Sequence, residues 1–167
     1  VDHLLGAPLR APDFGSRFGR QERRELVVVS PDLGSVTRAR KFAERLDAPL
    51  AIVDKRRQRA NVSEVMNIIG DVKGKRVILV DDMIDTAGTL VNAAQAVLEK
   101  GGAAEVYACA THGVLSGPAI DRIRESCIRE LVLLDTIPVG PDKMLDKITM
   151  LSVAPVFAEA IERIYQD

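Results

Sequence analysis

A cluster of acidic, hydroxyl and small residues follows a short apolar run, and its members have the chemistry of an anion site. The apolar run at 77–80 is typical of a buried strand. Two adjacent carboxylates, Asp81 and Asp82, come directly after it, with no cation next to them in the sequence. The turn that follows consists of Asp85, Thr86, Ala87, Gly88 and Thr89. Its backbone N–H groups are expected at the start of a helix, where outward donors and the helix dipole favour a phosphate.

The two carboxylates give this anion site a second kind of ligand. Vicinal hydroxyls donate hydrogen bonds to carboxylates, so a sugar diol beside the phosphate suits Asp81 and Asp82. A single Asp before a helix is more simply an N-cap. The complete run instead favours a phosphosugar site at the carboxyl end of a strand, where open α/β sheets bind ligands.

A second turn with an acidic residue follows another apolar run, at 26–29. It consists of Asp32, Leu33, Gly34 and Ser35, and a helical pattern follows it. Taken alone, Asp32 reads as a helix-entry residue rather than a metal ligand. Because the carboxyl ends of parallel strands share one edge of a sheet, we expect this turn beside Asp81, and that position favours the metal-ligand reading.

A basic run follows the next strand, at 50–53. Four of the six residues from 54 to 59 are cationic, among them Lys55 and Arg57. Such a run is usually a solvated loop. Here it starts on the same edge as two candidate anion sites, where cations would stabilise a transferring diphosphoryl group. We expect a mobile loop from residue 54 onward, followed by a return strand within 62–69.

Composition limits the classes of protein that remain. The chain has 167 residues, of which 47% are hydrophobic, and a net charge of −1. This length suits one domain with a proper core, and the charge balance argues against a nucleic-acid or membrane partner. No apolar run reaches the ~20 residues of a membrane span. Cys109 and Cys127 show no metal-binding spacing, so reduced, structural cysteines in a cytoplasmic protein are expected.

The order strand, turn, helix repeats along the chain. It predicts an α/β fold, a three-layer α/β/α sandwich with a mainly parallel sheet, over residues 26–167. Residues 1–25 are expected to be an irregular remnant of a longer chain, because Pro8, Pro12 and Gly15 would interrupt a helix. A helix near the C-terminal end is expected to bury an apolar face formed by Phe157, Ala160, Ile161 and Ile164.

The segment VILVDDMIDTAGTL resembles the phosphoribosyl diphosphate (PRPP)-binding signature of the type I phosphoribosyltransferase fold, and more narrowly the ribose-phosphate diphosphokinase (PRPP synthetase) family. From about residue 26 onward, the resemblance to the C-terminal half of this family is continuous, with four motifs in the family's order. It implies that Asp32 to Ser35 form the diphosphate loop and that Asp32 holds Mg²⁺. It implies a catalytic role for Lys55 and Arg57. Ribose 5-phosphate binding is implied for Arg57, Asp81, Asp82, Asp85, Thr86, Ala87, Gly88 and Thr89.

The resemblance also implies an activity. Family members transfer the diphosphoryl group of ATP to ribose 5-phosphate, giving PRPP and AMP, and they are homo-oligomers, often hexamers. The family's chain is longer, so we expect these residues to lack most of the ATP side and to be inactive alone. A phosphoribosyltransferase that consumes PRPP is one alternative, but no segment remains to cover a base. A non-catalytic regulatory relative is another, and the intact Lys55, Arg57, Asp85 and Thr89 argue against it.

Overall fold

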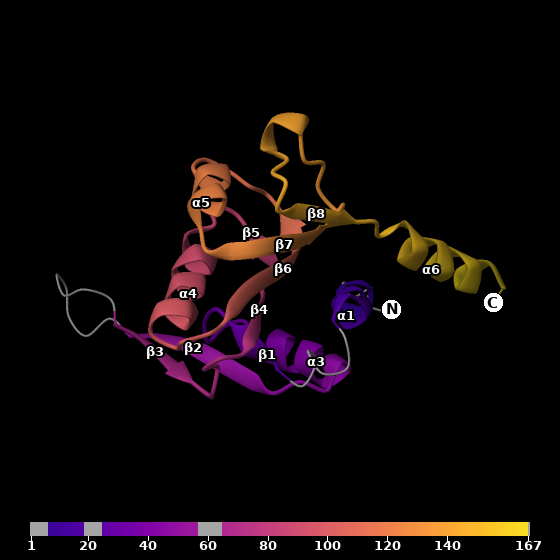
Figure 1. Ribbon diagram of the computed structural model, residues 1–167. Coiled ribbons are helices and arrows are strands. Elements are labelled where there is room, and N and C mark those ends of the chain that lie inside the picture. Colours follow the sequence, from indigo (N-terminus) through magenta and orange to yellow (C-terminus); the bar gives the residue numbers. More distant parts are fainter. Residues whose placement is uncertain (1–6, 19–24, 57–64, 167) are drawn as a thin grey trace.

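A computed structural model describes residues 7–18, 25–56 and 65–166 (Figure 1). Helices and strands alternate along most of this length, as the strand–turn–helix pattern predicts. The elements are α1 Ala7–Arg17, β1 Leu26–Ser30, α3 Val36–Leu46, β2 Leu50–Arg56, β3 Val65–Ile69, β4 Arg76–Val80, β5 Met83–Ile84, α4 Gly88–Glu99, β6 Glu105–Gly113, α5 Ala119–Glu125, β7 Ile128–Leu134, the short 3₁₀ helix η1 Pro141–Lys143, β8 Ile148–Leu151 and α6 Ala154–Gln166.

One sheet organises the domain. Its strand order is β3-β2-β1-β4-β6-β7-β8, and the short β5 pairs with β6. Every pairing between named strands is parallel except that of β2 with β3. The central strands β1 and β4 are apolar and buried along almost their whole length, as strands covered on both faces must be. The predicted α/β fold with a mainly parallel sheet is therefore confirmed.

Helices cover both faces of the sheet, which gives three layers (Figure 1). Alternate residues of each strand point to opposite faces. In β4, Val77 and Leu79 pack with α4 and α5, whereas Ile78 and Val80 pack with α1 and α3. The carboxyl end of β1 leads into α3, and that of β4 leads through the short β5 into α4, so both candidate turns lie at the same edge of the sheet.

The prediction of an irregular N-terminal segment is wrong for Ala7–Arg17, which form helix α1 despite two prolines. Pro8 lies in the first turn, where no intrahelical N–H bond is needed. Pro12 removes one hydrogen bond, but tertiary packing offsets this loss. Phe14 is fully buried and makes edge contacts with Phe42 of α3 and Tyr107 of β6, at 6.4 Å between ring centroids in both cases.

The basic run also differs from the prediction. Strand β2 continues through Asp54 and Lys55 to Arg56, so Lys55 lies in a strand and not in a loop. The predicted return strand forms as β3 and pairs antiparallel with β2, and this pairing extends β2 as far as Arg56. Arg57 lies outside the described residues.

The C-terminal helix forms as expected, but its predicted burial is wrong. None of the α6 residues is buried, and Phe157, Ile161 and Ile164 are 51%, 64% and 78% exposed. Figure 1 shows α6 projecting away from the sheet, so none of the described elements packs against its apolar face. In the part of the chain that the structure describes, no helix combines the length and apolarity needed to cross a membrane.

Candidate functional site

The turn at 85–89, here called the phosphate-type turn, and the turn at 32–35, here called the diphosphate-type turn, meet at one pocket. This pocket has a volume of about 150 Å³ and lies where β1 and β4 end. It is lined by Asp32, Asp81, Met83, Ile84, Asp85, Thr86, Ala87, Gly88, Thr89 and Leu90. The structure thus brings Asp32 to the turn at 85–89, although the two are about fifty residues apart in the sequence.

The backbone of the turn, which lines this pocket, has N–H groups that the helix itself does not use. Ala87 is the N-cap of α4, and Val91 N donates the first helical hydrogen bond, to Ala87 O at 3.0 Å. The amides of the three preceding residues, 88–90, therefore lie before the first intrahelical bond. Ala87 has a φ of +61°, a conformation that costs free energy for a residue with a Cβ and that recurs at ligand-binding turns. This geometry is that of a phosphate cradle.

The connection between β6 and α5 holds the turn in place. Val114 N and Leu115 N both donate to Ile84 O at 3.0 Å, and Ser116 N donates to Asp85 O at 3.0 Å. The Ser116 hydroxyl also donates to the Asp85 carboxylate. One carboxylate oxygen of Asp85 is therefore engaged by the fold, which orients this side chain at the pocket wall.

Arg38 is a residue of the site that the sequence analysis missed. Its Nη2 lies 2.8 Å from Asp82 Oδ2 and its Nη1 lies 3.8 Å from Asp81 Oδ1, so the acidic pair has a counter-ion supplied by the first turn of α3. The only signal in the sequence is its spacing, three residues after Ser35, which places both on one side of a helix start.

Ser35 connects the two turns. Its hydroxyl donates to Asp81 Oδ1 at 3.0 Å and accepts from Arg38 Nη1 at 3.3 Å, while its backbone N–H donates to Asp32 Oδ1 at 2.8 Å. The Ser35 side chain is thus buried, and its hydroxyl both donates and accepts a hydrogen bond. The carboxylate of Asp81 and the diphosphate-type turn therefore form one hydrogen-bonded unit.

The two adjacent carboxyls titrate differently. Burial raises the pKa of Asp81 from an ordinary value of 3.8 to about 6, and the nearby charge of Asp32 adds to this effect. Partial burial opposes ionisation of Asp82 as well. Its hydrogen bond with Asp81 and the charge of Arg38 outweigh this, so the pKa of Asp82 is lowered. Near neutral pH, Asp82 is therefore more completely ionised than Asp81.

The raised pKa of Asp81 predicts a pH-dependent stabilisation by Asp81→Asn. A carboxyl whose pKa is higher in the folded than in the unfolded chain stabilises fully below about pH 3.8, and this contribution is lost as the pH rises through about 6. Each pKa unit corresponds to about 1.4 kcal/mol, and solvent screening reduces the total to about 1–2 kcal/mol. We expect Asp81→Asn to raise the free energy of unfolding by that amount at pH 8, with the gain shrinking toward pH 4.

Urea unfolding across this pH range measures the effect, and Asp82→Asn is the matched control. Asp82 has a lowered pKa and an ion pair, so its replacement should destabilise at neutral pH instead. The same pH dependence in all three proteins would contradict the assignment of the buried carboxyl.

Of the two basic residues with an expected catalytic role, Lys55 lies in the described part of the chain. Lys55 is exposed on β2, opposite Met66 of β3, and does not line the pocket. Strand β2 lies beside β1, whose carboxyl end carries the Asp32 turn. Lys55 therefore belongs to the same edge of the sheet as the two turns but not to the wall that they form.

The acidic side chains of the pocket suit Mg²⁺ that is bound together with a substrate phosphate. The described residues contain no group of three His, Cys, Asp or Glu side chains placed to hold a metal ion. Mg²⁺ is usually bound by one or two carboxylates together with substrate phosphates and water. Asp32 and Asp81 line the same pocket and match that pattern.

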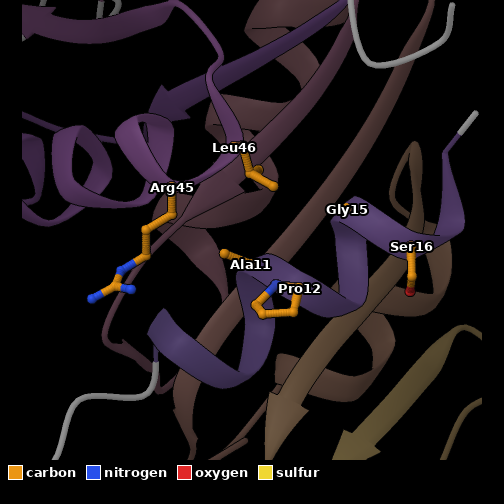
Figure 2. Close-up of a pocket in the computed structure, with 6 residues that line it drawn as sticks. All are labelled: Ala11, Pro12, Gly15, Ser16, Arg45 and Leu46. Atoms are coloured by element: carbon orange, nitrogen blue, oxygen red, sulfur yellow. The ribbon is translucent and has the colours of Figure 1, made fainter. Parts of the chain in front are cut away.

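A larger pocket, of about 430 Å³, lies between α1 and α3 (Figure 2). Its lining residues are Ala11, Pro12, Gly15, Ser16, Arg45 and Leu46. Arg45 and Leu46 end α3, whereas the candidate site lies at the start of that helix. This pocket contains no acidic side chain and no turn at a strand's carboxyl end, so it lacks the chemistry of the site.

Known proteins resemble this chain along its whole length. The ribose-phosphate pyrophosphokinase of Caldanaerobacter subterraneus subsp. tengcongensis is 66% identical over 166 residues, which cover 99% of this chain and 51% of the relative. That of Clostridium acetobutylicum is 63% identical over 167 residues, which cover 100% of this chain and 51% of the relative. The chain thus spans about half the length of the curated relatives that it matches.

Solved structures agree with the fold. The crystal structure of phosphoribosylpyrophosphate synthetase from Mycobacterium smegmatis has a TM-score of 0.84 at 40% identity, over 96% of this chain and 50% of that chain. Orotate phosphoribosyltransferase from Aeropyrum pernix has a TM-score of 0.55 at 19% identity, over 92% of this chain and 75% of that chain, which shows a shared fold alone. The predicted phosphoribosyltransferase-type fold is confirmed.

The family model for the phosphoribosyl synthetase-associated domain matches residues 58–167. This match includes both carboxylates Asp81 and Asp82 and the whole phosphate-type turn, and the resemblance to PRPP synthetases extends it to the Asp32 loop. The chain belongs to the phosphoribosyl synthetase-associated domain family.

Proposed function

We propose that this chain is the ribose 5-phosphate- and diphosphate-binding half of a ribose-phosphate diphosphokinase. The complete enzyme would transfer the diphosphoryl group of ATP to ribose 5-phosphate, giving PRPP and AMP. The observation that carries this proposal is the single pocket that joins a phosphate cradle, Asp81 and Asp32. The names of relatives at 66% and 63% identity support it.

Each wall of the pocket has a task in this reaction. The amides of 88–90 and the hydroxyls of Thr86 and Thr89 would bind the 5-phosphate. Asp81 and Asp82 would accept hydrogen bonds from the ribose hydroxyls. Arg38 already holds Asp82 at 2.8 Å, so that carboxylate is oriented before the sugar arrives.

The second turn would face the transferring group. Bound Mg²⁺ would neutralise the diphosphoryl oxygens, and Asp32 is the residue that would hold it, with Asp81 beside it. The hydrogen bond from Ser35 N fixes the Asp32 side chain at 2.8 Å. Lys55 and Arg57 would supply positive charge as the diphosphoryl group moves.

The complete enzyme is proposed to be a cytoplasmic homo-oligomer that also binds ATP. The exposed apolar face of α6 supports association, because apolar side chains of this size are normally covered in the working assembly. The shortness of the chain supports a second wall for ATP, since the relatives are about twice as long.

Calorimetric titration in the presence of Mg²⁺ tests the proposal. Ribose 5-phosphate should bind the unaltered chain, and Asp82→Ala should weaken this binding by about 10-fold to 100-fold, because hydrogen bonds to a charged group are lost. Inorganic phosphate occupies only the cradle, so its binding should change much less. Glu44→Ala removes an exposed carboxylate elsewhere on α3 and serves as the control. Equal ribose 5-phosphate binding by the unaltered chain and Asp82→Ala would remove the acidic pair from the site.

A further inference from the structure

Arg122 of α5 contacts the phosphate-type turn although it is not among the residues that line the pocket. Its Nη1 donates to the backbone oxygen of Thr86 at 2.9 Å. A Cβ added at Gly88 would lie 3.3 Å from the same nitrogen and 4.0 Å from Cζ. The guanidinium therefore rests against the first residue of α4, in space that exists because residue 88 has no side chain.

The hydrogen bond at Thr86 controls the direction of the next N–H group. A trans peptide is planar, so its C=O and N–H point in opposite directions. When Arg122 holds the carbonyl of Thr86, it also fixes the N–H of Ala87, which shares that peptide plane. Ala87 has the left-handed φ of +61°, and contacts from outside the turn, this one among them, help to keep that geometry.

The charge of the pocket gives the guanidinium a second effect. Three carboxylates, those of Asp32, Asp81 and Asp85, line the pocket, and its described lining includes no Lys or Arg. Arg38 is engaged with Asp82. A phosphate dianion would meet this negative potential, which the half charge of the α4 dipole only partly offsets. Arg122 adds a full positive charge beside the first turn of that helix.

We propose that Arg122 is a positioning residue for the phosphate cradle. It orients the N–H of Ala87, which precedes the cradle amides at 88–90, through the Thr86 carbonyl, and it lowers the repulsion that a phosphate meets on entry. The absence of a side chain at residue 88 permits the close approach of the guanidinium to this turn. The inference rests on the proposed function, because it deepens the role of the same site.

Arg122→Met tests this role, with Arg122→Lys and Arg124→Met beside it. Arg124 lies on the same helix, is exposed and pairs only locally with Asp121 in the described structure. We expect Arg122→Met to raise the dissociation constants of both ribose 5-phosphate and inorganic phosphate by about 10-fold to 100-fold. Arg122→Lys keeps the charge and should recover part of the loss. Arg124→Met should bind as the unaltered chain does, and the melting temperatures of all four proteins should agree closely.

Gly88→Ala adds a readout that a purely structural contact would not give. In the unaltered chain the new Cβ would shift the guanidinium by a few tenths of an ångström, so phosphate binding should weaken. In the Arg122→Met background the same change should have almost no further effect, because the coupled contact is already absent.

The outcomes separate this inference from the proposed function. If the unaltered chain binds ribose 5-phosphate and Arg122→Met binds it equally well, the role of Arg122 is overturned while the proposed function stands. If the unaltered chain binds neither ribose 5-phosphate nor inorganic phosphate, the proposed function fails and the role of Arg122 fails with it. Additive effects of Gly88→Ala and Arg122→Met would also overturn the coupling.

Discussion

In a complete enzyme that contains this chain, Lys55→Ala and Arg57→Ala are each expected to lower turnover by about 100-fold to 1,000-fold. Binding of ribose 5-phosphate should change far less. Most of the proposed binding contacts come from the turns at Asp32 and at 85–89, and Lys55 does not line the pocket that they form. Interactions made mainly in the transition state lower the turnover number without weakening the substrate complex.

Steady-state kinetics with separate variation of ATP and ribose 5-phosphate measures this split. Lys100→Ala is a suitable control, because it removes an exposed positive charge at the far end of α4. Unchanged turnover in both Lys55→Ala and Arg57→Ala would return the basic run to the role of a solvated surface segment. A large loss of ribose 5-phosphate affinity would instead make these residues part of the ground-state binding site.

The sequence was sufficient for the features that local pattern determines. The apolar run of β4, the acidic pair and the small residues of the turn are contiguous, so their order alone predicts a strand, a turn and a helix start. The alternation of strands and helices then predicts a parallel sheet whose carboxyl edge collects the turns. The position of Asp32 in the same pocket as Thr86 to Thr89 follows from that rule.

Long-range contacts could not be read in the same way. Arg38 and Arg122 reach the turns from two different helices, and no local pattern distinguishes them from other surface arginines. Helix α1 forms although Pro12 opposes it, because the burial of Phe14 outweighs a lost hydrogen bond. Tertiary packing commonly overrides local propensity in this way.

For α6, the helix itself could be predicted from the sequence, but its exposure to solvent could not. Its apolar spacing correctly predicts a helix, but periodicity says only that one face is suited to burial and not which partner buries it. Phe157 and Ile164 are exposed because no residue in the described part of the chain covers them. Lys55 likewise lies in a strand because β2 pairs with β3. The apolar run at 50–53 does not by itself show how far that pairing extends.

The central claim is that this chain supplies the ribose 5-phosphate and diphosphate side of the reaction and depends on a second half for ATP. The relatives are about twice as long as the chain, which supports a missing wall. Holding two substrates together in the right orientation can contribute up to about 7–11 kcal/mol to catalysis. Without the residues that bind ATP, most of the activity should therefore be lost, even with Asp32 and Lys55 in place.

Measurement of AMP release from ATP tests this claim most directly. The account predicts little or no AMP from the 167-residue chain alone. It predicts AMP formation that depends on ribose 5-phosphate once the chain is joined to the part of the Caldanaerobacter subterraneus relative that it does not cover. The joined protein carrying Asp82→Ala should lose most of that activity, which ties the product to this site. Robust, ribose 5-phosphate-dependent AMP formation by the 167 residues alone would contradict the account, because the nucleotide site would then lie within this chain.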